Sequence, residues 1–487
     1  GIGDLNDISL MPVVGKVTPG RGTAGDPSSG MWSRFSRADE RCAPGYYATR
    51  LLRYGIGVEL TASPRVGMSR YAFPASDDAG IVLDLENGQG WDRSTDCGIT
   101  ACSDRTVEGW RYSTGWADDQ RVYFHAEFSK PFERIVFTGA DTLSADGRSW
   151  LRVMVWLPDP VYSRRGVVQL VHGMAEHIER YDSFARFLAG LGYVVFGHDH
   201  IGHGKSVSSA DELGCMPLQG GKDILVADVL RAREAAFKAS RETGALPLFL
   251  FGHSMGSFVV RACIARNPKG LTGAVLCGTG NQPRALSLLG RTLSRAIGAL
   301  RGETYRSRLL DSLTIGAFSS AIEDARTDSD WISTDPAVVD AYLADPLSGQ
   351  AFSAGAYATL TDLTAEVVTK KSAAAVPKNL PLLFVAGADD PVGACGEGVR
   401  AAADLYRSQG VEDVREIIYP NMRHEILNEP RRVDVFTDVE QWFTECVVMN
   451  AVVRTREVSQ PHNAEGKEGG APAKEGAAAA ESGASEN

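Results

Sequence analysis

A serine stands between two glycines in the segment Gly252-His253-Ser254-Met255-Gly256. This spacing is typical of a sharp turn that exposes a nucleophilic serine between a strand and a helix, because glycine at both flanking positions lets the two elements pack closely. The apolar run at 246–251 predicts the strand, and the stretch at 258–266 is compatible with the helix. Ser254 is therefore the candidate nucleophile, with a helix N-terminus behind it that favours developing negative charge.

A serine hydroxyl needs a base and an orienting carboxylate, and with this kind of turn they follow in the chain order Ser, Asp, His. Asp389 and Asp390 come directly after a predicted strand at 382–385, and His424 comes after another at 414–419. Active sites of open α/β sheets gather at the carboxyl ends of the strands. We predict Asp390 as the acid, with Asp389 in reserve, and His424 as the base. The alternatives are that both aspartates only form the turn and that His424 is a surface loop residue.

Acyl transfer also needs two N–H groups that hold the oxyanion of the intermediate. One comes from the residue after the nucleophile, Met255. The predicted strand at 167–171 runs into His172-Gly173-Met174, so the backbone of Met174 is expected to supply the other.

A histidine-rich segment, His198-Asp199-His200 followed by His203, carries residue types that bind zinc. It lacks a helical His-Glu-x-x-His frame and a completing set of ligands. We expect these residues to form loop hydrogen bonds beneath the site, and we expect neither a metal nor a cofactor.

The elements that must position these residues form an alternating pattern from about residue 134 onward. Apolar runs alternate there with longer segments of helical period, which predicts a mostly parallel sheet covered by helices on both faces. The predicted strands are 150–157, 167–171, 193–196, 246–251, 273–277, 382–385 and 414–419. We expect an α/β domain over 133–448 with a helical cap at 281–377, followed by an Ala/Gly/Glu-rich disordered tail at 449–487.

The segment before it, residues 1–132, is rich in Gly, Pro, Ser and Asp and has short β-prone runs at 46–52, 58–61, 81–85 and 122–128. This spacing of strands and turns predicts a β-sandwich. Three tryptophans in it, Trp91, Trp110 and Trp116, are either core residues or platforms on which sugars stack.

The composition limits the classes of partner. The chain of 487 residues has a formal net charge of -11, which argues against nucleic acid and against an anionic membrane as electrostatic partners. No apolar run is long enough to span a membrane, and we expect a cytoplasmic protein. The eight cysteines are expected to be reduced and structural, with a Cys97–Cys102 disulfide or half a metal site as the alternatives.

The run at 171–206, together with FGHSMGS, GADDPVG and RHEILNE, resembles the monoacylglycerol lipase and lysophospholipase branch of the α/β-hydrolases, often grouped under the serine aminopeptidase name. The resemblance covers about 134–448. It implies cofactor-free ester hydrolysis under a cap with an apolar acyl channel, and the roles given above to Ser254, Asp390, His424, Met174 and Met255. The long, polar cap departs from the family.

The N-terminal segments GDLNDISLMPVVG, YGIGVELTASPRVGMSRYAFP and GWADDQRVYFHAEFSKPF resemble the N-terminal β-sandwich of family 92 glycoside hydrolases, which are exo-acting α-mannosidases. Only part of that sandwich is present, over about 1–132, and the catalytic domain of those enzymes has no counterpart here. The resemblance therefore does not imply mannosidase activity, and it indicates a gene fusion near residue 132.

Taken together, the sequence predicts a carboxylic ester hydrolase that cleaves a small lipid, a monoacylglycerol or a lysophospholipid, through an acyl-enzyme on Ser254. One alternative is an aminopeptidase or amidase on the same residues. Another is a glycan-binding protein that acts through the N-terminal sandwich. The expected partners are the lipid substrate, a membrane or micelle touched transiently by the cap, and a carbohydrate at the N-terminal domain.

Overall fold

The computed structural model describes residues 8–15, 30–76, 78–86, 93–103, 105–115, 117–132, 135–138, 141–158, 163–240 and 244–459. Trp91, Trp116 and residues 460–487 of the expected tail lie outside these ranges.

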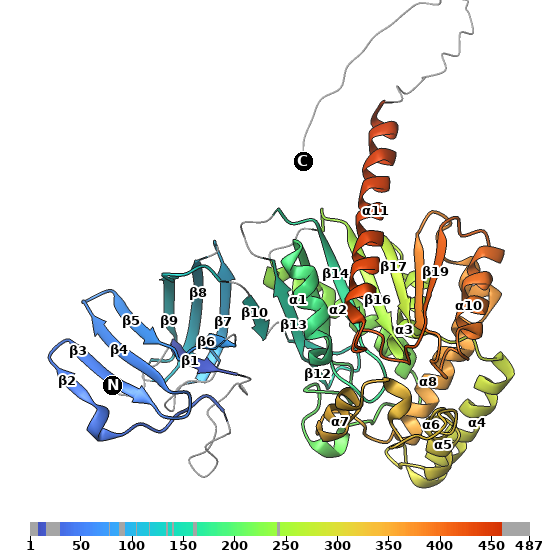
Figure 1. The fold of residues 1–487 in the computed structure, drawn as a ribbon, viewed down its shortest axis with the longest axis horizontal. Coiled ribbons are helices and arrows are strands. Elements are labelled where there is room, and N and C mark those ends of the chain that lie inside the picture. Colours follow the sequence, from blue (N-terminus) through green and yellow to red (C-terminus); the bar gives the residue numbers. More distant parts are fainter. Residues whose placement is uncertain are drawn as a thin grey trace, which may run out of the picture.

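An eight-stranded sheet forms the centre of the larger part of the chain, with the strand order β10-β13-β15-β14-β16-β17-β18-β19 (Figure 1). Its strands are β10 (Ile135–Thr138), β13 (Val153–Leu157), β14 (Gly166–Val171), β15 (Tyr193–His198), β16 (Leu248–His253), β17 (Leu271–Cys277), β18 (Leu382–Gly387) and β19 (Val414–Tyr419). β10 and β13 run antiparallel to their neighbours, and the other pairs are parallel. The predicted α/β-hydrolase fold with a mostly parallel sheet is confirmed.

Helices cover both faces of this sheet, because its central strands are apolar on both sides. One face packs against α1 (Asp182–Gly190) and α11 (Arg432–Ser459), through residues such as Phe184 and Phe436. The other face packs against α2 (Gly221–Ser240), α3 (Met255–Arg266) and α10 (Glu397–Ser408). α11 continues to Ser459, so the boundary expected at 449 falls inside a helix.

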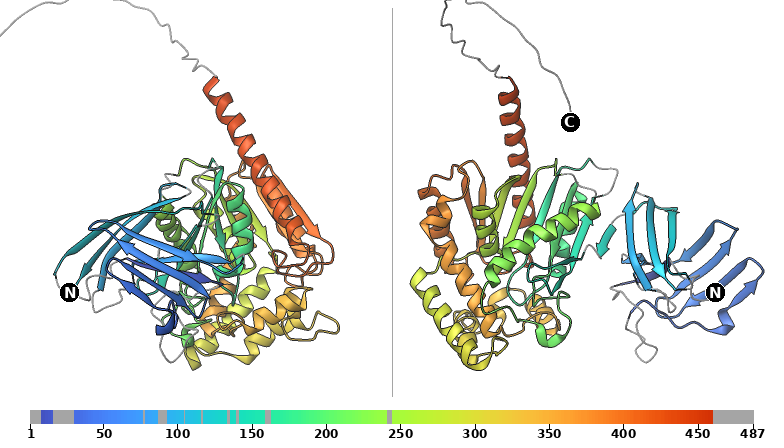
Figure 2. Two further views of the ribbon diagram at one scale, coloured as in Figure 1. Left: turned by 60° about the vertical axis from the view of Figure 1, so that its left-hand side comes forward. Right: turned by 180° about the vertical axis from the view of Figure 1, so that it is seen from behind.

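The chain between β17 and β18 is helical, as the broken strand rhythm at 281–377 predicts. It contains α4 (Arg284–Arg301), α5 (Arg308–Ser312), α6 (Ile315–Ser319), η5 (Asp330–Ile332), α7 (Pro336–Ala344), α8 (Ala354–Val367) and α9 (Lys370–Ala374). Side-chain N-caps from Asp335, Ser353 and Thr369 begin the last three α-helices. Figures 1 and 2 show α4, α5 and α6 together at one end of the sheet.

The N-terminal segment folds into short antiparallel sheets. They pair β1 (Ser9–Val14) with β6 (Ala79–Asp84), join β2 (Arg41–Ala43), β3 (Tyr46–Leu51), β4 (Ile56–Ala62) and β5 (Gly67–Ala72), and join β7 (Arg93–Ala101), β8 (Thr106–Thr114) and β9 (Gln120–Glu127). Val13, Ile56 and Val58 are buried between the first two sheets. The all-β character expected for this segment is confirmed, and Figure 2 shows these strands grouped beside the eight-stranded sheet.

Five short elements complete the described structure. They are η2 (Arg37–Asp39), η3 (Ile178–Tyr181), η4 (Ala210–Glu212) and the pair β11 (Thr142–Leu143) and β12 (Trp150–Leu151). All eight cysteines carry thiols, as expected. Three of them, Cys263, Cys277 and Cys446, are buried, and the other five are partly or fully exposed. In the described part of the chain, no helix has the length and apolar character needed to cross a membrane.

Candidate active site

Ser254 lies at the sharp turn between β16 and α3, as the glycine spacing predicts. Its backbone has φ 52° and ψ -120°, a conformation that residues other than glycine rarely adopt. The Ser254 backbone N–H donates to the carbonyl oxygen of Cys277 at 2.9 Å, which ties the turn to the next strand. The side chain is half-buried at the N-terminal end of α3, so its hydroxyl is presented with the helix dipole behind it.

The two flanking glycines are required by close backbone approach. A Cβ at Gly256 would lie 2.0 Å from the carbonyl oxygen of Val171 in β14, and one at Gly252 would lie 2.4 Å from the carbonyl oxygen of Gly256. Any side chain at these positions would therefore push α3 away from the sheet. The motif thus positions Ser254 by packing the helix directly onto the strand ends.

Asp390 and His424 meet across the ends of β18 and β19. The Asp390 carboxylate lies 3.0 Å from Nδ1 of His424, and both side chains are buried. The other Asp390 oxygen accepts the Val392 backbone N–H at 2.9 Å. The side chain of Asp389 is exposed to solvent instead, and the structure therefore brings the first-choice aspartate, not the reserve, to the histidine.

The second ring nitrogen of His424, Nε2, is the one that could exchange a proton with a neighbouring group. Nε2 is buried and has no hydrogen-bond partner among the described residues. Gly278, at φ 58°, passes so close that an added Cβ would lie 3.0 Å from Cε1 of His424. Nδ1 is held by Asp390, so a protonated Nδ1 leaves Nε2 able to accept a proton.

The loop that carries Met174 approaches Ser254 directly. A Cβ at Gly173 would lie 3.0 Å from Cβ of Ser254, and the Gly173 backbone N–H donates to Glu176 at 2.6 Å. Ala175 reverses the chain with φ 52°. Met255, the other predicted oxyanion residue, is buried at the first position of α3. The structure thus brings the loop of Met174 and the first turn of α3 to the same place.

Glu176 and His253 form a buried pair beside Ser254 that the sequence patterns did not predict. Nδ1 of His253 lies 3.1 Å from Glu176, and its Nε2 lies 3.2 Å from the backbone oxygen of His424. Burial acts to raise the pKa of Glu176, but the hydrogen bond and charge of His253 outweigh it and lower that pKa to about 2. Burial likewise acts to lower the pKa of His253, and the Glu176 carboxylate raises it above its ordinary value. Through His253, the pair connects the residue before Ser254 to the backbone of His424.

Arg180 extends this buried network toward the helical segment between β17 and β18, which we call the cap. Its guanidinium pairs with Glu425, the residue after His424, and lies 3.5 Å from Glu176. The same guanidinium lies over the ring of Tyr342 in α7, 4.8 Å from the ring centroid. Opposite charges raise its pKa above the ordinary range against the effect of burial. Arg180 therefore contacts Glu176 in the loop of Met174, Glu425 in the loop of His424 and Tyr342 in α7.

The cap is also attached to the base loop through the backbone. Glu425 donates its N–H to the carbonyl oxygen of Ile332 at 2.7 Å, and His424 donates to that of Trp331 at 3.4 Å. The Trp331 ring stacks near the His424 ring with centroids 5.1 Å apart, and Phe318 lies beside Trp331. These aromatic side chains give the candidate base an apolar neighbour from the cap.

The histidine-rich segment packs against His172, which begins the loop of Met174. Nε2 of His172 accepts the His200 backbone N–H at 2.9 Å, and the two rings lie 4.3 Å apart. Burial lowers the pKa values of His172, His198, His200 and His203, which favours neutral rings. In the described ranges, no three His, Cys, Asp or Glu side chains are grouped so that they could hold a metal ion.

Comparison with known proteins identifies the family of this chain. The family model for serine aminopeptidase, S33, matches residues 162–431, which is more than half of the chain. The chain belongs to this family. The hydrolase is 32% identical over 297 residues to a monoacylglycerol lipase of Mycolicibacterium smegmatis, which covers 59% of this chain and 90% of that protein. It is 26% identical over 306 residues to the monoglyceride lipase of Homo sapiens, which covers 62% of this chain and 89% of that protein.

A solved structure supports the same assignment. A carboxyl esterase from Bacillus coagulans, solved in complex with glycerol, is 29% identical with a TM-score of 0.59, over 64% of this chain and 99% of that one. The hydrolase is accordingly an ester hydrolase, and the predicted enzyme class is confirmed.

A second family model matches the beginning of the hydrolase. It is the glycosyl hydrolase family 92 N-terminal domain, over residues 1–157. Both resemblances noted in the sequence are therefore confirmed. This match extends past residue 132 and includes β13, a strand of the eight-stranded sheet.

Several residues around the site were missed because their partners are remote in the sequence. Glu176 and His253 are separated by 77 positions, and Arg180 and Glu425 by 245. The sequence signal that could have revealed them was an acidic residue in a short, apolar loop next to the predicted site. A buried carboxylate needs a hydrogen-bonding or charged partner, so such a residue indicates a buried pair.

Proposed function

We propose that the hydrolase cleaves the carboxylic ester of a small lipid, a monoacylglycerol or a lysophospholipid, through an acyl-enzyme on Ser254. The observation that carries this proposal is the buried Asp390–His424 pair, 3.0 Å between carboxylate and Nδ1, in a fold that presents Ser254 at a strained turn. The lipases among its relatives support the substrate class.

In the first step, Ser254 Oγ attacks the ester carbonyl carbon while Nε2 of His424 takes the hydroxyl proton. Asp390 holds the imidazole with its proton on Nδ1 and stabilises the imidazolium that forms. The backbone N–H groups of Met174 and Met255 donate to the oxyanion. Collapse of the intermediate breaks the bond to the alcohol oxygen, which takes the proton from His424 and leaves.

In the second step, water attacks the acyl-enzyme by the same route. His424 accepts a proton from the water, the oxyanion forms again between Met174 and Met255, and the proton passes to Ser254 as the fatty acid leaves. General-base catalysis contributes roughly 10² to 10⁴-fold to such a reaction, and an oxyanion donor roughly 10² to 10³-fold. The apolar contact of Trp331 with His424 favours an apolar acyl group near the base.

The decisive experiment is labelling of the purified full chain with a fluorophosphonate probe, followed by hydrolysis of monoacylglycerols and lysophospholipids of graded chain length. We expect labelling that is lost in Ser254→Ala, and hydrolysis that depends on chain length. Ser408→Ala, at an exposed serine that ends α10, is the matched control and keeps the label. Esterase turnover retained in Ser254→Ala protein would overturn the proposal.

Hydrolysis of an amide or peptide is the competing function on the same residues, since the matching family is named after a serine aminopeptidase. Comparing a p-nitrophenyl ester with an aminoacyl-nitroanilide separates the two. We expect rapid release from the ester and little from the anilide. The reverse order would make the amide the substrate.

We further propose that the cap touches a membrane or micelle while substrate enters. α4 exposes Leu286, Leu289 and Leu300, with exposed fractions of 58%, 65% and 84%, and α5 of the same cap exposes Leu309. Exposed leucines gathered on one element are typical of a lipid-facing surface. Co-sedimentation with phosphatidylcholine vesicles should weaken in a Leu289→Ser/Leu300→Ser double variant. It should not change in Leu52→Ser, which alters an exposed leucine of the N-terminal segment.

A further inference from the structure

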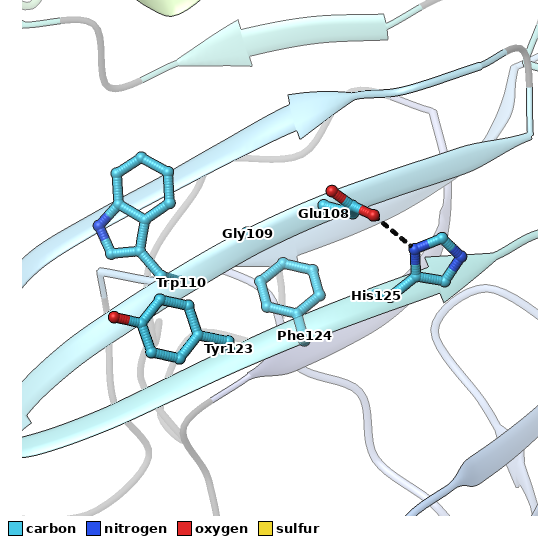
Figure 3. Close-up of a pocket in the computed structure, with 6 residues that line it drawn as sticks. All are labelled: Glu108, Gly109, Trp110, Tyr123, Phe124 and His125. Carbon is cyan, nitrogen blue, oxygen red and sulfur yellow. Dashed lines mark hydrogen bonds and ion pairs between the residues drawn. The ribbon is translucent and has the colours of Figure 1, made fainter.

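The three-stranded sheet of β7, β8 and β9 has one buried face and one face lined by polar and aromatic side chains. Along β8, Val107, Arg111 and Ser113 are buried, whereas Glu108 and Trp110 alternate with them on the other face. Tyr123 and His125 lie opposite these two residues in β9, because Trp110 pairs with Tyr123 and Glu108 pairs with His125. Figure 3 shows these side chains along the two strands.

Trp110 lies flat over a glycine of the neighbouring strand. It pairs with Gly98 in β7, and a Cβ at Gly98 would lie 2.4 Å from the indole ring. The indole Nε1 donates to Asp96 at 3.2 Å, which fixes the rotation of the ring. The side chain remains partly exposed. One indole face thus rests on the sheet.

Tyr123 continues this platform and is also held in place. Its side chain is 66% exposed, and its hydroxyl lies 2.7 Å from that of Tyr112. The two rings meet edge to face at 5.9 Å, and the guanidinium of Arg121 lies over the Tyr112 ring at 5.1 Å. Because these rings are fixed before any ligand arrives, binding to them loses little side-chain entropy.

A polar pair stands directly beside the aromatic pair. Nδ1 of His125 lies 3.0 Å from the Glu108 carboxylate, as the dashed line in Figure 3 marks. Glu108, Trp110, Tyr123 and His125 line an open depression of about 440 Å³ together with Gly109 and Phe124. We call these residues the Trp110 surface.

We propose that the Trp110 surface binds a neutral pyranose sugar of a polysaccharide. The C–H face of a pyranose ring carries slight positive charge, which suits the negative face of an indole or phenol ring. Its hydroxyls are donors and acceptors, which suits a carboxylate and an imidazole at the edge of the platform. A flat aromatic platform bordered by a polar pair provides both kinds of contact at once.

The charges on this surface disfavour an anionic ligand. Asp96 and Glu108 border the platform, and the guanidinium of Arg121 is occupied by Asp119 and the Tyr112 ring. A phosphate or nucleic-acid backbone would meet like charge here. A quaternary ammonium group is the competing ligand, but such groups bind where several rings enclose the cation, and the Trp110 surface is an open platform.

The test is affinity electrophoresis of the full chain in gels that contain mannan, xylan or soluble starch, with choline-agarose chromatography in parallel. We expect at least one polysaccharide to retard the native protein. Trp110→Ala should remove the retardation, and Glu108→Gln should weaken it about five- to tenfold. Trp150→Ala is the matched control, because Trp150 is 63% exposed and lies in β12, outside the Trp110 surface.

Thermal unfolding of each variant checks that it folds, and Tyr123→Ala replaces Trp110→Ala if the latter does not. Tyr123 is largely exposed, so its removal should leave the sheet intact. Retardation lost in the Trp110 or Tyr123 variant but kept in Trp150→Ala supports the proposal. No retardation by any of the three polysaccharides, equal retardation in all variants, or retention on choline-agarose alone would overturn it.

Discussion

Thr334 of the cap and Glu429 behind the base loop are joined by two hydrogen bonds. The Thr334 backbone N–H donates to one Glu429 oxygen at 2.9 Å, and the Thr334 hydroxyl donates to the other. The same carboxylate, which is fully buried, accepts the Arg423 backbone N–H at 2.8 Å. Arg423 in turn donates to the carbonyl oxygen of Asp330 at 2.6 Å. These hydrogen bonds therefore hold the loop of His424 against the cap segment at residues 330–334.

We predict that Glu429→Gln lowers kcat more than it raises KM for a short, soluble ester. Glutamine keeps the size of the side chain but replaces one acceptor oxygen with a donor, which leaves a Thr334 or Arg423 group without its partner. Loss of a buried hydrogen bond to a charged group costs about 1 to 3 kcal/mol, and the freed base loop holds His424 less well. Steady-state kinetics and denaturant unfolding measure the two effects.

Glu323→Gln is the matched control, because Glu323 is an exposed glutamate of the same cap. It should change neither kcat nor the free energy of unfolding. Normal kcat in Glu429→Gln would show that the cap attachment does not position the base.

Asp390→Asn should lower kcat by roughly 10³ to 10⁴-fold, while Asp389→Asn keeps activity near that of the native protein. An asparagine at 390 can donate to His424 and thereby favours the wrong imidazole tautomer, which costs about that factor in a serine triad. Asp389 is exposed and does not reach the histidine. The measurement is p-nitrophenyl ester turnover of both variants, and equal loss in the two would remove the geometric basis for preferring Asp390.

Glu176→Gln should destabilise the fold by about 3 kcal/mol, because it removes one partner of a buried ion pair. Glu176 has a pKa lowered to about 2, so its charge stabilises the fold above its ordinary pKa of 4.5, and this contribution is lost as the pH falls toward 2. His253 has a raised pKa, so its contribution is present below its ordinary pKa of 6.5 and is lost as the pH rises through the raised value.

The difference in unfolding temperature between native protein and Glu176→Gln should accordingly be largest near pH 5 to 6. It should shrink as the pH falls toward 2, where Glu176 becomes protonated, and as the pH rises above 6.5 through the raised pKa of His253. Thermal unfolding across this range tests the sign of both shifts. A difference that stays constant with pH would mean that Glu176 and His253 do not act as a charged pair.

Gly256→Ala should abolish activity and lower the yield of folded protein. The added Cβ would lie 2.0 Å from the carbonyl oxygen of Val171 and 2.5 Å from that of His172, and both are backbone atoms at the carboxyl end of β14. Gly190→Ala at the end of α1 is the matched control, since nothing lies within 4 Å of its added Cβ. Comparable solubility and turnover of the two variants would contradict the packing argument for the motif.

The sequence by itself determined the parts that depend on local patterns. Apolar runs separated by helical segments predicted the strands β14 to β19, because a sheet buried on both faces needs continuous apolar strands. The spacing of Gly252 and Gly256 predicted the turn at Ser254, since only glycine permits that approach of helix and strand. The ends of β18 and β19 likewise predicted where Asp390 and His424 would lie.

Only the tertiary structure decided which side chains meet. Asp389 and Asp390 are neighbours in one loop, and the direction of the turn alone sends Asp390 to His424 and Asp389 to solvent. The contacts of Glu176 with His253 and of Glu429 with Thr334 join residues 77 and 95 positions apart. Sequence patterns report the period of one element at a time, whereas these buried charges find partners only when separate elements are packed together.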